Sequence, residues 1–231
     1  MQLIIFTDLD GTFLDKNYSF SDALPALNLI KKKKIPLIFC TSKTEAETLY
    51  WQQKIGISYP FIVENGSAII FPDNKLRNII LGTNYSLLKQ KLEKIEYNTH
   101  SKFEYMSNMT VKELVDYTGL SVEQAKMAKT RLYSESFLIC RGSPQKVRDH
   151  IKKAGLVYTR ATLFHHILGD TDKGKAVRVL TGVLRKQYGQ IKTISFGDSF
   201  NDKPMLKATS KSYLIKNGPF EWNQIILKII S

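Results

Sequence analysis

The sequence has little cysteine, no long apolar run and no leader-like start. Its two cysteines, Cys40 and Cys140, exclude a disulfide framework and a zinc site made of cysteines alone. No apolar stretch approaches the roughly 20 residues that a membrane-spanning helix needs. The apolar start of the chain has no basic segment before it, and acidic residues follow at once, so we expect no signal peptide. These absences predict a cytoplasmic protein without a membrane partner.

Acidic residues are scarce relative to basic ones. The 231 residues include 34 Lys and Arg against 21 Asp and Glu, a formal net charge of +13. Such a charge suits an anionic partner, which can be a nucleic acid, a lipid surface or a phosphorylated metabolite. A nucleic-acid-binding module is the alternative from another class, but the positive charge is spread and no reader motif or Arg-aromatic tract is present. We therefore expect a phosphorylated small molecule and no nucleic acid; the oligomeric state stays open.

Hydrophobic residues make up 43% of the chain, enough for a buried core. Residues 3–6 and 35–40 are short apolar runs that predict buried strands, and we expect Cys40, at the end of the second run, to be a buried thiol. A helix is expected over residues 21–34, with Ser21 as its N-cap and Pro25 in its first turn. Its buried face is expected to contain four apolar residues: Ala23, Leu24, Leu27 and Ile30.

A second helix is expected through about residue 54, followed by a hairpin. Two apolar runs, 61–63 and 68–71, flank Asn65-Gly66, a strong hairpin signal. From about residue 83 the pattern changes, and helix signals at 85–95, 110–117 and 121–131 mix with strand signals near 102–106, 136–141 and 157–160. A helix at 174–187 and a strand at 193–196 then resume the first pattern.

This order predicts an α/β fold with a Rossmann-like, three-layer parallel-sheet core and an inserted α+β module. The core is expected to comprise residues 1–82 and 167–231, and the inserted module residues 83–166. Ligands of such sheets bind beyond the carboxyl ends of the strands. Polar residues follow three of the predicted strands or start a helix at that edge: Asp8, Asp10, Thr41, Ser42, Lys173, Asp198, Asn201 and Asp202.

Clustered carboxylates repel one another and need a counter-charge. A hard dication such as Mg²⁺ supplies it and favours sites that also hold a substrate phosphate. A nearby lysine adds fixed positive charge, and the hydroxyl of Thr41 can donate to phosphate oxygens. The pattern therefore predicts a pocket for a phosphoryl group, with a carboxylate placed to attack phosphorus.

The order of these motifs resembles the haloacid dehalogenase superfamily of phosphatases. The matching residues are 8–12 (Asp-Leu-Asp-Gly-Thr), Thr41, Lys173 and 197–202 (Gly-Asp-Ser-Phe-Asn-Asp). The resemblance implies that Asp8 is the nucleophile and that Asp10 is the general acid and base. It also implies that Asp8, the Asp10 backbone carbonyl and Asp198 bind Mg²⁺, with Asp202 acting through water or a neighbouring ligand. Lys173 is expected to neutralise nucleophile and phosphate, with Lys175 as the competing lysine.

Several further segments are similar to mannosyl-3-phosphoglycerate phosphatases. They are 41–44 with Glu47, 64–69, 131–135 and 172–176, and the inserted module resembles the cap of sugar phosphatases, which closes over the site. The resemblance implies hydrolysis of mannosyl-3-phosphoglycerate to mannosylglycerate, a compatible solute, and phosphate. The alternatives are a glucosyl-3-phosphoglycerate phosphatase, a broader sugar-phosphate phosphatase and a phosphomannomutase-like enzyme.

The expected substrate carries a phosphate, a carboxylate and sugar hydroxyls. Lys43 and Arg131 are candidates for the carboxylate. Candidates for the other substrate contacts are Ser42, Thr44, Glu64, Asn65, Gly66, Ser134 and Glu135. Plain structural roles stay open for some of them: Asn65-Gly66 as only a turn, Lys43 as a solvated lysine, and Arg131 with Glu135 as an ion pair on a helix surface. His165 and His166 are not expected to bind a metal.

Overall fold

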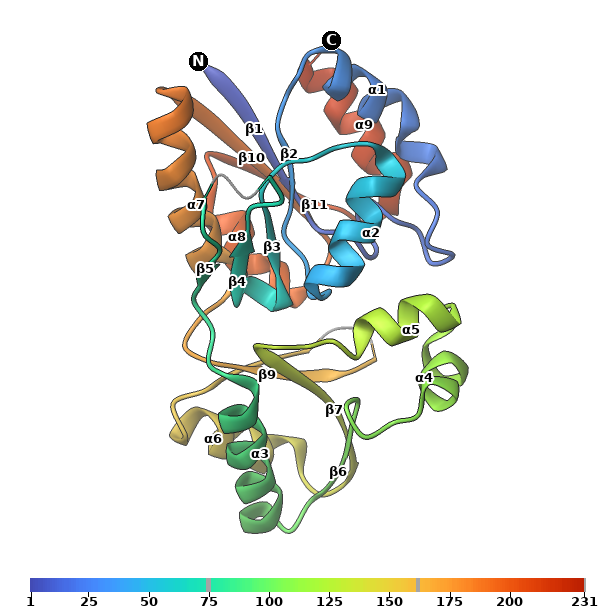
Figure 1. Ribbon diagram of the computed structural model, residues 1–231, viewed down its shortest axis with the longest axis vertical. Coiled ribbons are helices and arrows are strands. Elements are labelled where there is room, and N and C mark those ends of the chain that lie inside the picture. The colour runs from blue at the N-terminus through green and yellow to red at the C-terminus, as the bar shows by residue number, and fades with distance from the viewer. Residues whose placement is uncertain (74–75, 161–162, 231) are drawn as a thin grey trace.

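The computed structural model of the chain describes residues 1–73, 76–160 and 163–230. Figure 1 shows two units stacked along the long axis, with both termini in the same unit. We call this unit the core and the other, formed by the elements from α3 to β9, the cap. No helix in the described ranges is long and apolar enough to cross a membrane.

The centre of the core is a parallel sheet. Its strands lie in the order β11-β10-β1-β2, and their bounds are β1 Gln2–Thr7, β2 Leu37–Phe39, β10 Ile191–Gly197 and β11 Lys211–Leu214. A parallel bridge between Cys40 and Ile62 places β3 (Phe61–Val63) beside β2. From β3 a meander of antiparallel strands continues through β4 (Ala68–Ile70) and β5 (Ile79–Ile80). The predicted hairpin is therefore confirmed.

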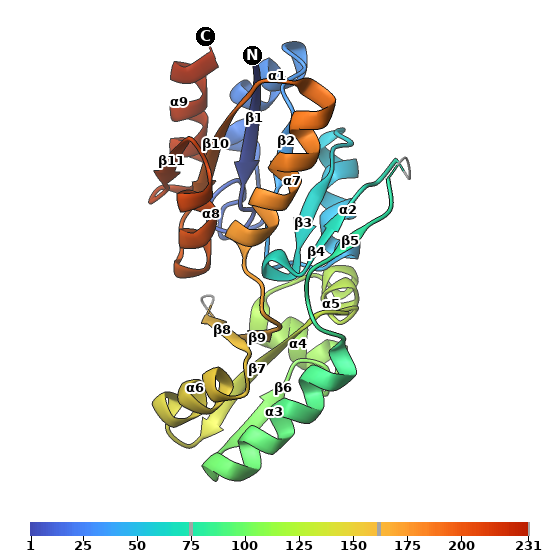
Figure 2. The ribbon, with the colours of Figure 1, turned by 90° about the vertical axis from the view of Figure 1, so that its left-hand side faces the viewer.

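Helices cover both faces of this sheet (Figures 1 and 2). One face carries α1 (Leu24–Lys32), α2 (Glu45–Ile55) and α9 (Gly218–Ile230), and the other carries α7 (Lys173–Tyr188) and α8 (Lys203–Ala208). Successive strand residues point to opposite faces, so Ile5 packs with the first group of helices and Ile4 and Phe6 with the second. The predicted three-layer α/β/α class is confirmed, and Cys40 is buried as expected.

The first predicted helix differs from the structure at its start. Residues Ser21–Ala23 form a 3₁₀ turn, and α1 begins only at Leu24, so Ser21 is not its N-cap. Leu24 is 40% exposed, whereas Ala26 is buried with Leu27 and Ile30. The predicted face was therefore wrong at Leu24, because successive helix residues are rotated by about 100° and Leu24 lies at the edge of the stripe that Ala26, Leu27 and Ile30 form.

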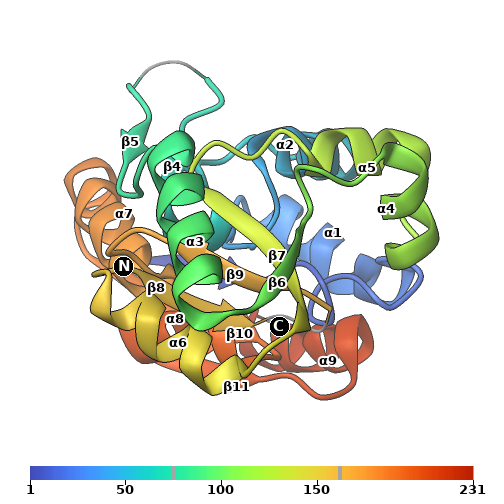
Figure 3. The ribbon, with the colours of Figure 1, turned by 90° about the horizontal axis from the view of Figure 1, so that it is seen from below.

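The cap has an antiparallel sheet in the order β6-β7-β9-β8. Its strands are β6 Lys102–Tyr105, β7 Ser134–Arg141, β8 Val157–Arg160 and β9 His165–Leu168. Helices α3 (Tyr85–Thr99) and α6 (Pro144–Lys153) cover the face of this sheet that points away from the core, as Figure 3 shows. Beside the sheet, α4 (Val111–Thr118) and α5 (Val122–Ala128) form a small separate cluster.

Strand β9 alters the predicted limit of the inserted module. It pairs with β7 and β8 along its whole length up to Leu168, so a boundary between residues 166 and 167 would divide it. The sequence analysis also missed α6, although Ser143 caps it and Pro144 occupies its first turn, a start signal that the sequence does carry.

Candidate active site

Three aspartates meet at the carboxyl edge of the core sheet. Asp8 follows β1 and Asp198 follows β10, and these strands pair in parallel up to Thr7 and Phe196. One carboxylate oxygen from each of Asp8, Asp198 and Asp202 lies within 4.8 Å of the others. Parallel strands end at the same edge of a sheet, so residues nearly 200 positions apart become neighbours, as the motif order predicts.

The turn after Asp8 brings the chain close to Asp198. Gly11 has a φ of +73°, and a Cβ atom there would lie 2.6 Å from the Asp198 carboxylate. Only glycine combines this backbone conformation with so close an approach. The next residue, Thr12, donates from its hydroxyl to Asp198 Oδ1 at 3.3 Å. The turn therefore fixes the orientation of the Asp198 carboxylate as well as the path of the chain beyond Asp10.

Lys173 supplies the fixed positive charge of this cluster. Lys173 is the first residue of α7 and is 1% exposed. Its Nζ lies 2.9 Å from Asp8 Oδ1 and 2.5 Å from Asp202 Oδ1. The competing Lys175 turns outward and donates to the backbone carbonyl of Asp170. Of the two lysines, the structure therefore places only Lys173 against Asp8.

Both carboxylate oxygens of Asp202 contact other groups of the protein. Its second oxygen, Oδ2, accepts from the backbone N–H groups of Asp198 and Ser199 at 3.1 and 3.0 Å. These bonds hold the loop after β10 in the conformation that aims Asp198 at Asp8. The other oxygen is taken by Lys173, so Asp202 serves the site mainly by fixing its neighbours.

The charges of the cluster are not balanced. Burial raises the pKa of Asp8 well above its usual range, and the negative charge of Asp202 raises it further, while Lys173 works in the opposite direction. Burial and then Asp202 raise the pKa of Asp198 to about 6. Burial lowers the pKa of Lys173, but Asp202 and Asp8 outweigh it and raise the pKa overall. Three carboxylates around one lysine leave negative charge that a hard, oxygen-binding dication fits.

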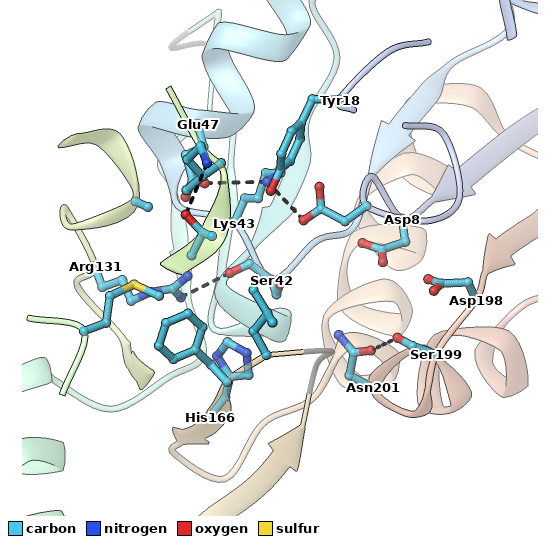
Figure 4. A pocket seen from close by; sticks show the side chains of 17 residues that line it. Asp8, Tyr18, Ser42, Lys43, Glu47, Arg131, His166, Asp198, Ser199 and Asn201 are labelled. Atoms are coloured by element: carbon cyan, nitrogen blue, oxygen red, sulfur yellow. Dashed lines mark hydrogen bonds and ion pairs between the residues drawn. The ribbon is translucent and has the colours of Figure 1, made fainter. Parts of the chain in front are cut away.

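A cavity of about 190 Å³ opens from this cluster toward the cap (Figure 4). Residues of both units line it: Asp8, Asp10, Tyr18, Ser42, Lys43, Glu47, Met106, Thr118, Leu120, Ala128, Arg131, Leu163, Phe164, His166, Asp198, Ser199 and Asn201. Tyr18, Glu47 and His166 are lining residues that the sequence analysis did not select as site residues.

Lys43 is a buried member of this cavity. Its Nζ lies 3.0 Å from Asp10 Oδ2 and 3.7 Å from Glu47 Oε1, and 5.0 Å from the centre of the Tyr18 ring. Burial lowers the pKa of Lys43, but Asp10 and Glu47 outweigh it and raise the pKa overall. The alternative of a solvated Lys43 is therefore wrong. Lys43 and Glu47 are four residues apart at the start of a helix, a spacing that favours an ion pair and could have identified Glu47 from the sequence.

Thr41 and Thr44 lie behind the cavity wall. Thr41 is fully buried, and its Oγ1 accepts from the backbone N–H of Lys43 at 3.2 Å. Thr44 caps α2 in a reciprocal arrangement with Glu47, and its hydroxyl also lies 3.1 Å from the Met127 carbonyl of the cap. Neither residue is among those that line the cavity. Thr44 caps α2 and contacts the cap unit, and its substrate contact stays a prediction.

Arg131 reaches the cavity from the loop between α5 and β7. Its Nη1 donates to the Ser42 carbonyl at 3.1 Å and to Ser134 Oγ at 3.0 Å. Glu135 lies in β7, outside the cavity, and accepts from the Tyr85 hydroxyl. Because Arg131 is not helical and has other partners, the alternative of a helix-surface ion pair with Glu135 is wrong.

The turn at 64–66 connects the two units. Glu64 accepts from the backbone N–H groups of Leu132 and Tyr133 at 2.9 and 3.1 Å and from Ser134 Oγ at 2.6 Å. A Cβ atom on Gly66 would lie 2.2 Å from the Asp172 carbonyl. Glu64, Gly66 and Ser134 are not among the residues that line the cavity around Asp8. Glu64 and Ser134 join the core to residues 132–134 of the cap, and Gly66 allows the close approach of Asp172 just before α7.

Asn65 faces a second cavity. Its Oδ1 accepts from Asn201 Nδ2 at 3.0 Å, and both asparagines line a cavity of about 370 Å³ between α8 and β8. Asn201 also borders the cavity around Asp8, so the two hollows are neighbours.

The chain belongs to the haloacid dehalogenase-like hydrolase family. The model of that family matches residues 5–136 and 143–231. A glucosyl-3-phosphoglycerate/mannosyl-3-phosphoglycerate phosphatase of Methanococcoides burtonii is 39% identical over 100% of this chain and 98% of its own length. A mannosyl-3-phosphoglycerate phosphatase of Pyrococcus furiosus is 34% identical over 92% of this chain and 90% of its own. The prediction of a phosphatase of this superfamily is confirmed.

Solved structures share the fold. A haloacid dehalogenase-like hydrolase from B. subtilis superposes with a TM-score of 0.69 at 19% identity and covers 97% of this chain and 93% of its own. A sugar phosphatase of subclass IIB superposes with a TM-score of 0.67 at 14% identity, covering 99% and 98%. At such identities the likeness concerns the fold alone.

Proposed function

We propose that the protein is a Mg²⁺-dependent phosphomonoesterase that hydrolyses mannosyl-3-phosphoglycerate, or its glucosyl counterpart, through an aspartyl-phosphate. The observation that carries the proposal is the cluster of Asp8, Asp198 and Lys173 at the floor of a cavity roofed by the cap. The names of the two relatives described above support the mannosyl substrate, and the name of the Methanococcoides burtonii relative supports the glucosyl compound as a second substrate.

Asp8 is the proposed nucleophile. Lys173 holds one oxygen of its carboxylate, so the attacking group is oriented before the substrate arrives. The Asp8 and Asp198 carboxylates and the Asp10 backbone carbonyl would hold Mg²⁺, with Asp202 in support. When bound, the ion neutralises negative charge on the cluster and on the phosphate. Lys173 compensates the charge that remains as the oxygen–phosphorus bond to Asp8 forms and the ester bond breaks.

Asp10 is the proposed acid and base. Its Oδ2 is held by Lys43, whereas Oδ1 is buried without a hydrogen-bond partner in the described part of the chain. Protonated Asp10 gives its proton to the leaving alkoxide, and the carboxylate then takes a proton from the water that hydrolyses the aspartyl-phosphate. The proton removed from water replaces the proton given to the first product, so the residue returns to its starting state.

The cationic wall of the cavity suits the carboxylate of a phosphoglycerate. Arg131 contacts the Ser42 carbonyl and Ser134, and among the described residues it has no carboxylate partner. Its planar guanidinium matches a carboxylate in a two-point contact. Lys43 stands on the core side of the same cavity. We assign the substrate carboxylate to these two residues.

The test is phosphate release from mannosyl- and glucosyl-3-phosphoglycerate, with Mg²⁺ and with a chelator. We expect turnover of at least one compound that requires Mg²⁺ and disappears in Asp8→Asn. Asp170→Asn is the matched control, because the Asp170 side chain is 95% exposed. Full activity of Asp8→Asn would refute the nucleophile. Comparable kcat/KM values for simple hexose phosphates would indicate a broader phosphatase, and transfer of phosphate to a sugar would indicate a mutase.

A further inference from the structure

Buried polar atoms without a hydrogen-bond partner gather where the core and the cap face each other. In the described part of the chain, five such atoms line the two neighbouring cavities: Asp10 Oδ1, Asn65 Nδ2, Arg131 Nε, Thr159 Oγ1 and His166 Nε2. Native proteins leave few buried polar groups unpaired, because each costs about 1–3 kcal/mol. Asp10 and Arg131 have roles in the proposed function, but Thr159 and His166 have none.

Strand pairing places Thr159 and His166 side by side. In the cap sheet, His166 pairs with Ser136 of β7 on one side and with Thr159 of β8 on the other. Residues paired across neighbouring strands carry their side chains on the same face. The next pair along β7 and β9 is Phe137 with His165, and Phe137 packs under α3 and α6 on the far face. The row of Ser136, His166 and Thr159 therefore faces the core, and we call it the cap-sheet row.

A hydrogen bond at one of its two ring nitrogens orients the His166 side chain. This side chain is 4% exposed, and Nδ1 is 2.9 Å from Ser136 Oγ, while Nε2 has no partner among the residues that the structure describes. Figure 4 shows the ring among the side chains that line the cavity, between Arg131 and Asn201. The bond to Ser136 thus orients the ring and leaves Nε2 for a ligand.

Thr159 extends the same surface. It is 7% exposed and lines the cavity that Asn65 and Asn201 also line. Its hydroxyl has no hydrogen-bond partner within residues 1–73, 76–160 and 163–230. Asn201 borders both cavities. Within the cap-sheet row, His166 therefore borders the cavity above Asp8 and Thr159 borders the adjoining cavity, so a single ligand anchored at Asp8 can extend past both.

The chemistry of the row suits hydroxyl groups better than charges. Burial, then Arg131 and His165, lower the pKa of His166 to about 3, so the ring is neutral at ordinary pH. A neutral imidazole nitrogen and a threonine hydroxyl each exchange one hydrogen bond with a group that can donate or accept. Sugar hydroxyls do both, whereas a phosphate or carboxylate is better served by Lys173, Lys43 and Arg131.

We propose that His166 and Thr159 form the subsite that reads the hydroxyls of the glycosyl group and so determine which sugar the enzyme accepts. The inference rests on the proposed function, since it needs a substrate whose phosphate is bound at Asp8 and whose sugar lies under the cap.

The test compares substrates with and without the sugar. Thr159→Val keeps the shape of the side chain and removes its hydroxyl, whereas Thr159→Ser is the matched control that keeps it. His166→Asn retains an amide near the position of Nδ1, facing Ser136, and has nothing at Nε2, whereas His166→Gln extends an amide toward the Nε2 position. For each variant, kcat/KM is measured on the glycosyl-3-phosphoglycerate and on 3-phosphoglycerate, which lacks the sugar, and thermal unfolding checks that the variant is folded.

We expect Thr159→Val and His166→Asn to lower kcat/KM for the glycosyl compound by about 5- to 150-fold, the range for a buried polar group left unpaired. Turnover of 3-phosphoglycerate should change by less than about twofold, and Thr159→Ser and His166→Gln should recover part of the loss. The mannosyl-to-glucosyl ratio should also shift, because these sugars differ at one hydroxyl. Equal losses on both substrates in a folded variant, or no loss on either, would overturn the subsite.

Failure of the proposed function gives a different result. In that case the wild-type enzyme hydrolyses another sugar phosphate with Mg²⁺ and leaves glycosyl-3-phosphoglycerates intact. The same variants are then compared on that sugar phosphate and on glycerol 3-phosphate. Selective loss on the sugar ester supports the cap-sheet row as a sugar subsite, and equal loss on both esters contradicts it.

Discussion

Lys173 Nζ lies 2.9 Å from Asp8 Oδ1, with the lysine side chain fully buried and the aspartate side chain 7% exposed. The pair joins the end of the first strand to the start of a helix 165 positions later, and Asp202 completes it from the opposite side of the lysine. The attacking group, its counter-charge and the residue that orients the Asp198 loop thus form one buried unit. Disturbing any member should affect the other two.

Replacing Lys173 with Met should remove activity and stability together. Asp8 and Asp202 would then be buried without their counter-charge, a loss of about 3–5 kcal/mol in the free energy of unfolding. We expect kcat to fall by a factor on the order of 10² or more, because the loss of one preorganised charge has that effect in other active sites. Urea unfolding and phosphate release measure the two effects. Lys175→Met is the control, and similar losses there would contradict the placement of Lys173.

Comparing Gly11→Ala with Gly119→Ala should separate the cost of backbone strain from the effect on the active site. Both Gly11 and Gly119 have a positive φ, but a Cβ on Gly11 would lie 2.6 Å from Asp198, whereas a Cβ on Gly119 would meet no described residue within 4 Å. Each substitution should cost about 1 kcal/mol of stability through the left-handed backbone. Only Gly11→Ala should also lower kcat and weaken the stabilisation by Mg²⁺, measured as a shift of Tm. Equal kinetic effects of the two variants would contradict this geometry.

Glu64→Gln should loosen the connection between cap and core. The carboxylate accepts three hydrogen bonds from residues 132–134, and an amide can accept at only one of its two atoms. We expect the free energy of unfolding to fall by about 1–3 kcal/mol and amide hydrogen exchange at 132–134 to become faster, while Mg²⁺ still raises Tm. Glu123→Gln, on the exposed face of α5, is the control. Unchanged exchange at 132–134 would show that Glu64 does not secure the linker.

His166 should make stability depend on pH. Its pKa is lowered to about 3 in the folded protein, first by burial and then by Arg131, whereas an unfolded histidine titrates near 6.5. Between these values the unfolded state binds the extra proton, so stability falls as the pH falls, by about 1.4 kcal/mol per pH unit. Above about pH 6.5 the residue adds no pH dependence.

His166→Asn should therefore reduce the slope of the unfolding free energy against pH between about 6 and 4. His100→Asn is the control, because His100 is exposed and has a positive φ that asparagine tolerates. The measurement is urea unfolding at several pH values. If the slopes of the wild type and His166→Asn agree, the His166 ring is not held neutral in the folded protein.

Local sequence patterns were enough to predict the fold class and the cluster of aspartates in the site. Apolar runs and helical periods are local signals, and the rule that ligands bind beyond the carboxyl ends of parallel strands predicts that Asp8, Lys173 and Asp198 lie together. The same rules failed where the pattern was short or ambiguous. No strand was predicted at β9, because two of its four residues are histidines and the apolar run is short. The start of the first helix was also predicted wrongly, because residues Ser21–Ala23 form a 3₁₀ turn.

The contacts of the cap residues could not be predicted from local patterns and depend on long-range packing. Glu64 meets its partners about 70 positions away, and His166 faces the cavity because of its register with Ser136, 30 positions earlier. Such contacts depend on how strands pair and on how two units lie against each other. Shifting the register of a strand by one residue would turn His166 to the opposite face. The local sequence around a residue does not encode that choice, because it is fixed by packing across the whole chain.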